Sequence, residues 1–138
     1  MKTQKILVLL ILLLMTSCTK SPQELLELSE KNIEDSKVDM AINDLQTLLK
    51  KHPNDSLASK AQYKLASIYL NWENDPERGY DALQQTLNKY PESIHGEQAK
   101  AQLDEFPEYI LNKAESLRKQ KLLKEAVDHL MYMVGKYT

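Results

Sequence analysis

The sequence has few of the residues that build disulfides, glycine-rich loops or nucleic-acid interfaces. Its one cysteine, Cys18, cannot form a disulfide within the chain. Its three glycines do not form a glycine-rich phosphate-binding loop. The 18 basic and 20 acidic residues include no prominent run of one sign, which argues against nucleic acid or an anionic membrane surface as the partner. We therefore expect stability to come from the packing of apolar side chains.

The first residues have the order of features that is typical of a secretory signal. Lys2 and Lys5 precede an unbroken apolar run over residues 6–14, and the small polar residue Ser17 follows. The apolar run is too short to span a bilayer as a helix. These features predict a cleaved signal peptide over residues 1–17.

The end of this segment, Leu14-Met15-Thr16-Ser17-Cys18, resembles a bacterial lipobox. The resemblance implies that Cys18 is acylated after the signal is cut, that residues 18–21 form a short tether, and that residues 22–138 form the folded domain. The alternative is an ordinary secretory signal with an incidental cysteine. Two or three acyl chains would anchor the protein stably in a membrane.

The rest of the chain has apolar residues at steps of three and four, which predicts helices throughout. The stripes are Val38, Ala41, Ile42, Leu45, Leu48 and Leu49; Ala61, Leu65, Ile68, Tyr69 and Trp72; Tyr80, Leu83, Leu87 and Tyr90; and Ala126, Val127, Leu130, Met133, Val134 and Tyr137. No alternating pattern of strands competes with them. The sequence therefore predicts an all-α fold.

Helix boundaries are marked by capping residues and prolines. Ser21 and Asp75 each precede a proline and an acidic residue, and Ser36 is a further candidate cap. The predicted helices cover residues 22–35, 37–51, 56–72, 76–90, 94–105, 107–120 and 122–137. Pro107 separates two of them, with one kinked helix as the alternative. Because the connections are short, neighbouring helices should run antiparallel.

Internal repetition then indicates the architecture. Small residues recur at positions 41, 79 and 126, and each is followed four residues later by leucine. Together with Leu65-Ala66 and Tyr69, this arrangement resembles the tetratricopeptide repeat, although Gln62 stands where that family often has tryptophan. The resemblance implies antiparallel helical hairpins stacked into a short right-handed solenoid. The lipobox, the Ala61–Tyr69 helix and the Lys89–Ser93 segment further resemble the BamD family of outer-membrane assembly lipoproteins.

The sequence offers no recognisable catalytic or metal-binding motif. His52, His95 and His129 are far apart in the sequence, and neither an HExxH pair nor a G-x-S-x-G elbow is present. We therefore predict a protein that is not an enzyme, with no cofactor, metal, small-molecule substrate or nucleic acid. An enzyme that uses carboxylates on glycans is a third hypothesis, without a paired constellation to support it.

In the tetratricopeptide family the first helix of each hairpin faces the partner. The resemblance places five partner-binding residues on the helix 56–72: Lys60, Tyr63, Ser67, Leu70 and Asn71. Tyr63 and Leu70 could instead pack against a neighbouring helix. The family members that clamp a C-terminal carboxylate carry Lys and Asn where this chain has Tyr63 and Ser67, which argues against that use.

The leading hypothesis is a non-catalytic, lipid-anchored scaffold that binds other envelope proteins in outer-membrane protein assembly. The alternative is an accessory factor for another envelope system, such as a secretion pilot or a regulator of cell-wall enzymes. In a cell with two membranes, the sorting rule for such lipoproteins implies the outer membrane, facing the periplasm, because Thr19 rather than Asp follows the cysteine. The outer face of the plasma membrane is the alternative.

Overall fold

The computed structural model describes residues 20–137, and within them it contains helices and no strand. The predicted signal peptide, Cys18 and Thr19 lie outside the described residues. The helices are α2 (Pro22–Glu34), α3 (Val38–Lys51), α4 (Ala58–Asn71), α5 (Pro76–Lys89), α6 (Ile94–Lys119) and α7 (Leu123–Tyr137). The prediction of an all-α helical-repeat fold is confirmed.

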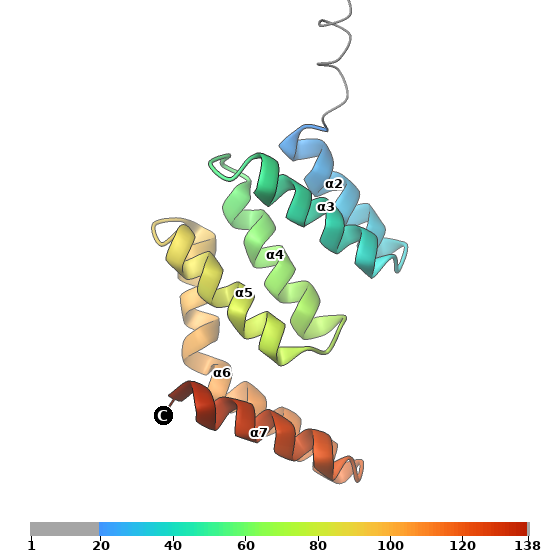
Figure 1. Ribbon diagram of the computed structural model, residues 1–138, viewed down its shortest axis with the longest axis vertical. Helices are drawn as coiled ribbons and strands as arrows, with labels where there is room; N and C mark the ends of the chain where they lie inside the picture. The colour runs from blue at the N-terminus through green and yellow to red at the C-terminus, as the bar shows by residue number, and fades with distance from the viewer. Residues whose placement is uncertain (1–19, 138) are drawn as a thin grey trace, which may run out of the picture.

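The helices form successive hairpins that stack along the long axis of the molecule (Figure 1). Within the described residues, α2 pairs with α3, α4 with α5, and α6 with α7. Contacts between α3 and α4 and between α5 and α6 join one hairpin to the next. Each hairpin is thereby covered mainly by its neighbours in the chain, as in other helical repeats.

Two of the predicted helix starts are confirmed, and one is wrong. Ser21 and Glu24 form a reciprocal capping box, and Asp75 accepts a hydrogen bond from the backbone N–H of Arg78 at 3.0 Å. Ser36 does not cap α3. Its backbone has a φ of 59°, and Lys37 precedes the helix without a side-chain cap.

The prediction of separate helices over 94–105 and 107–120 is wrong, because a single helix of 26 residues, α6, contains Pro107 in its interior. Buried apolar residues occur on both sides of the proline, among them Phe106 and Ile110. Packing of this continuous stripe offsets the hydrogen bond that proline removes. The helix changes direction along its length, so that its first part lies beside α5 and its last part beside α7 (Figure 1).

Specific side-chain contacts also join the helices. In the first hairpin, the buried amide of Asn32 donates to a carboxylate oxygen of Asp44 at 2.8 Å. Between α7 and α5, Tyr132 packs edge-on to Tyr80, with ring centroids 6.3 Å apart, and Lys136 pairs with Asp81 at 3.0 Å. Tyr132 and Lys136 therefore dock α7 on α5.

The apolar stripe predicted for the last helix is only partly buried. Ala126 and Met133 belong to the core, whereas Val127, Leu130 and Val134 are exposed. Among the described residues, no helix is both long and apolar enough to cross a membrane.

Candidate functional site

Helix α4 carries all five predicted partner-binding residues, and the structure gives them different surroundings. Lys60 and Lys64 both approach Glu30 of α2, at 3.6 and 2.9 Å. The hydrogen bond from Lys64 is the main cause that lowers the pKa of the Glu30 carboxyl. Lys60 therefore forms part of an ion-pair cluster that joins the first two hairpins.

Tyr63 and Leu70 take part in packing within the chain. The ring of Tyr63 lies 5.9 Å from that of His95 on α6, and burial raises the pKa of the Tyr63 hydroxyl. Leu70 lies so close to Gly79 that a Cβ on that residue would approach its Cδ2 to 2.3 Å. Of the two interpretations of these side chains, contact with a neighbouring helix describes them in this structure.

Ser67 and Asn71 line a groove between α2 and α4, which we call the α2–α4 groove. The groove has a volume of about 350 Å³. Its apolar lining includes Ile33, Leu45 and Ile68, and its polar lining includes Glu30, Glu34 and Lys64. An apolar floor with polar groups at its rim is the usual character of a site that receives a side chain from a partner.

Trp72 also lines this groove, and the sequence did not identify it as a site residue. It was expected to pack in the stripe of its helix, but 52% of its surface is exposed. Helix α4 ends at Asn71, so Trp72 is its C-cap residue and lies at the end of the groove. Its position as the last member of the stripe, followed by Glu73 and Asn74, was the available signal that the helix ends there.

A smaller groove of about 180 Å³ lies between α4 and α6. Leu70 and Asn71 line it, together with Phe106 and Tyr109. Asn71 thus borders both grooves, and its side chain is exposed. The structure therefore brings Ser67, Leu70 and Asn71 to two adjoining grooves, whereas Lys60 and Tyr63 line neither of them.

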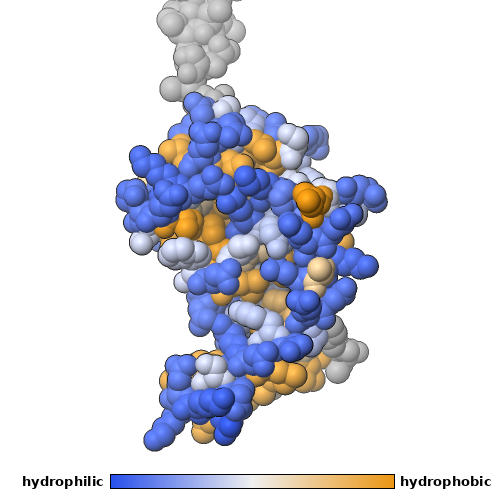
Figure 2. Space-filling view, turned by 180° about the vertical axis from the view of Figure 1, so that it is seen from behind, coloured by the Kyte–Doolittle hydropathy of each residue, from blue (hydrophilic) through white to orange (hydrophobic). Residues whose placement is uncertain are grey.

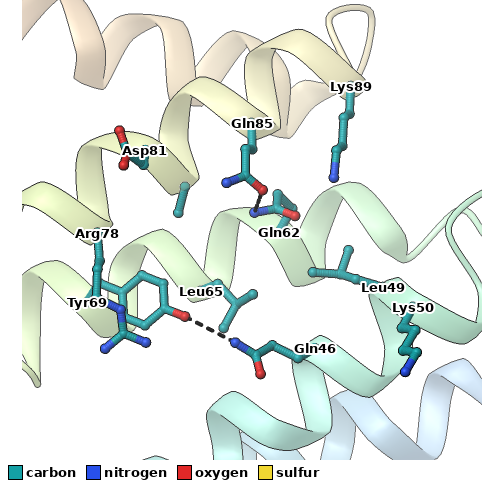
Figure 3. Close-up of a pocket in the computed structure, with 11 residues that line it drawn as sticks. Gln46, Leu49, Lys50, Gln62, Leu65, Tyr69, Arg78, Asp81, Gln85 and Lys89 are labelled. Carbon is teal, nitrogen blue, oxygen red and sulfur yellow. Dashed lines mark hydrogen bonds between the residues drawn. The ribbon is translucent and has the colours of Figure 1, made fainter.

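A third groove, of about 520 Å³, lies among α3, α4 and α5 and is more polar (Figure 3). Gln62 donates to Gln85, and Gln46 donates to the hydroxyl of Tyr69, both at 3.5 Å. The guanidinium of Arg78 lies 4.0 Å from the centroid of the Tyr69 ring.

The charged residues that line this third groove are Lys50, Arg78, Asp81 and Lys89. Asp81 pairs with Lys136 and Arg78 pairs with Glu73, so part of this charge is neutralised within the chain. This groove was not predicted from the sequence, since the family resemblance singles out only the first helix of the hairpin.

The described residues do not assemble a metal site, since residues 20–137 contain no group of three or more His, Cys, Asp or Glu side chains that could hold an ion. His95 contacts the hydroxyl of Ser59 through Nδ1 at 3.2 Å. Burial is the main cause that lowers the pKa of His95, which favours its neutral form. These contacts join α4 to α6 and place His95 in a packing role.

Comparison with known families identifies the central hairpin. Residues 60–93 match the family described as the tetratricopeptide repeat. They form a tetratricopeptide repeat. The repeat includes most of α4 and all of α5, and therefore Ser67, Asn71 and Trp72. Tetratricopeptide repeats commonly mediate binding between proteins and are typically non-catalytic. No curated protein matches the chain, and no solved structure matches it.

Proposed function

We propose that this protein is a non-catalytic scaffold that binds another protein through the α2–α4 groove. One observation carries the proposal: a tetratricopeptide repeat has an exposed tryptophan, Trp72, at the end of a groove with an apolar floor. Tryptophan is enriched among the residues that contribute most to binding between proteins, because it buries a large rigid surface. Ser67 and Asn71 add polar groups beside it.

The proposal includes a lipid anchor on Cys18. It is supported by the basic start, the short apolar run and the lipobox-like residues 14–18. The proposed location is the outer membrane, with the helical domain in the periplasm, and the outer face of the plasma membrane is the alternative. Either location keeps the scaffold close to envelope proteins and raises its effective concentration for them.

We further propose outer-membrane protein assembly as the process that the scaffold serves, because of the sequence resemblance to BamD-type lipoproteins. The alternative is an accessory role in secretion or in the regulation of cell-wall enzymes. The identity of the bound protein distinguishes these roles.

Site-specific photo-crosslinking in living cells tests the proposal. A photoreactive amino acid replaces Trp72 in the full chain, and in a second strain it replaces Met40, which is 56% exposed on α3 and lines none of the three grooves described above. We expect a defined crosslinked protein from position 72 and not from position 40. The same products from both positions, or none from position 72, would contradict binding through this groove.

The crosslinked protein is then identified by mass spectrometry. A component of barrel assembly supports the leading role, and a secretion or cell-wall protein supports the alternative. A crosslinked sugar polymer instead of a protein would contradict the scaffold function and favour the glycan hypothesis.

A further inference from the structure

The last helix exposes apolar residues that have buried counterparts in the earlier hairpins. Leu123, Val127 and Met131 are 60%, 51% and 68% exposed. They lie four residues apart and therefore form one ridge along α7. Leu130 lies beside this ridge and is also exposed. We call these four residues the α7 ridge.

In α3 and α5, the positions that correspond to the α7 ridge are covered by the helix that follows. The residues equivalent to Val127 and Leu130 are Ile42 and Leu45 in α3 and Tyr80 and Leu83 in α5, and all four are buried. In those hairpins the next helix, α4 or α6, packs on α3 or α5. No described helix follows α7. The α7 ridge therefore has the character of a surface that receives a helix.

One residue of the ridge departs from the repeat. At the position of Met131, α3 carries Gln46 and α5 carries Gln84. The apolar surface of α7 is thus wider than that of its counterparts. At the lower end of the molecule, where α6 and α7 lie, Figure 2 shows apolar areas between hydrophilic residues. An exposed apolar patch on the surface of a domain commonly marks an interface.

We propose that the α7 ridge binds the α7 ridge of a second copy of this chain, with the two helices antiparallel. Within the ridge, the spacing of Leu123, Val127 and Met131 is unchanged when the direction of the helix is reversed. In a two-fold arrangement centred on Val127, this residue meets Val127 of the second copy, and Leu123 meets Met131. Each copy thereby covers the apolar surface of the other.

The charges beside the ridge favour the antiparallel direction. Lys124 and Asp128 lie on the same flank and form an ion pair at 2.6 Å within one helix. In the antiparallel arrangement the same flanks of both copies adjoin. The positions of Lys124 in one copy and Asp128 in the other are then offset along the helix axis by about two residues, roughly 3 Å. In a parallel two-fold arrangement opposite flanks adjoin, so Lys124 would not lie beside Asp128 of the other copy. The self-association does not depend on the proposed binding groove, which lies between other helices.

Disulfide trapping in cells tests this interface. The full chain carries Val127→Cys in a Cys18→Ser background, so that the new thiol is the only one, and Met40→Cys in the same background is the control. Facing positions across a two-fold axis allow the short Cβ separation that a disulfide needs. We expect a disulfide-linked dimer from Val127→Cys under mild oxidation and little from Met40→Cys. Equal trapping at both positions, or none at position 127, would overturn the proposal.

A charge swap tests whether the two α7 helices run antiparallel. Asp128→Lys should lower the amount of trapped dimer by about fivefold, because it replaces attraction to Lys124 of the other copy by repulsion. Adding Lys124→Asp to that variant should restore trapping. These exposed positions leave the fold intact, and the helical circular dichroism of both variants checks this. Trapping that is insensitive to the swap would contradict the antiparallel arrangement.

Discussion

Gly96 lies directly against the backbone carbonyl of Tyr90. A Cβ on residue 96 would be 2.1 Å from the Tyr90 oxygen, which is closer than atoms can approach. This contact lets α6 start immediately after the turn that ends α5, with Ser93 as its N-cap. The close approach of the two helices therefore depends on glycine at this position.

Gly96→Ala should lower the free energy of unfolding by about 1–3 kcal/mol, because backbone must move to admit the methyl group. Chemical denaturation followed by circular dichroism measures the change. Gly135→Ala is the matched control, since a Cβ there meets no atom within 4 Å, and helix propensity should make it neutral or stabilising by up to about 1 kcal/mol. Equal destabilisation by both substitutions would contradict this account.

Asp44→Ala should destabilise the first hairpin by about 1–3 kcal/mol, because it leaves the buried amide of Asn32 without its acceptor. The double variant Asn32→Ala and Asp44→Ala should cost less than the sum of the two single variants. A double-mutant cycle measures the difference. Strictly additive costs would show that the hydrogen bond does not couple the two helices.

Acidification should weaken the contact of α4 with α6 through His95. Burial lowers the pKa of His95, and Lys60 and Lys64 lower it further, so the folded chain holds fewer protons at this residue than the unfolded chain. The stability that neutral His95 contributes is fully present above its pKa in the unfolded chain, about 6.5. It is lost as the pH falls through the lower pKa of His95 in the folded chain. Thermal melting across this range measures the loss.

His95→Gln should reduce that pH dependence while keeping a polar group beside Ser59. Burial and Lys113 also lower the pKa of His129, so the single substitution should remove only part of the pH dependence of stability. A melting curve for His95→Gln with the same pH dependence as the wild type would contradict the assignment.

The predicted lipid anchor on Cys18 can be tested independently of the helical domain. Cys18→Ser removes the only thiol in the chain, so the variant should incorporate no labelled fatty acid and should either stay uncleaved or leave the membrane fraction. The wild type should be labelled and should fractionate with membranes. An unlabelled wild type would contradict lipidation.

The sequence predicted the elements of this fold better than its exposed surfaces. Periodicity located the helices because each buries an apolar stripe, and Ser21 and Asp75 marked their starts by local hydrogen bonds. The same periodicity could not decide how much of a stripe is covered. Val127 and Leu130 match buried residues of the earlier hairpins but are exposed, because burial depends on a neighbouring helix.

Pro107 and Trp72 show the same limit in two other ways. A proline predicts a break, but the apolar residues on both sides of Pro107 keep α6 continuous. A tryptophan at the end of a stripe predicts packing, but Trp72 caps its helix and borders a groove instead. The family resemblance predicts Ser67 and Asn71 as partner-facing residues of the first helix of the hairpin, and both line this groove. The binding role of all five predicted residues stays a prediction.

The affinity of the protein crosslinked at position 72 tests the central claim most directly. Binding of that protein to the wild type, to Trp72→Ala and to Met40→Ala is measured at equal concentrations in the same detergent. The account predicts at least about tenfold weaker binding for Trp72→Ala, because a buried tryptophan at an interface commonly contributes 2 kcal/mol or more. Met40→Ala should bind as the wild type does. Unchanged affinity for Trp72→Ala would contradict the claim that the α2–α4 groove is the binding site.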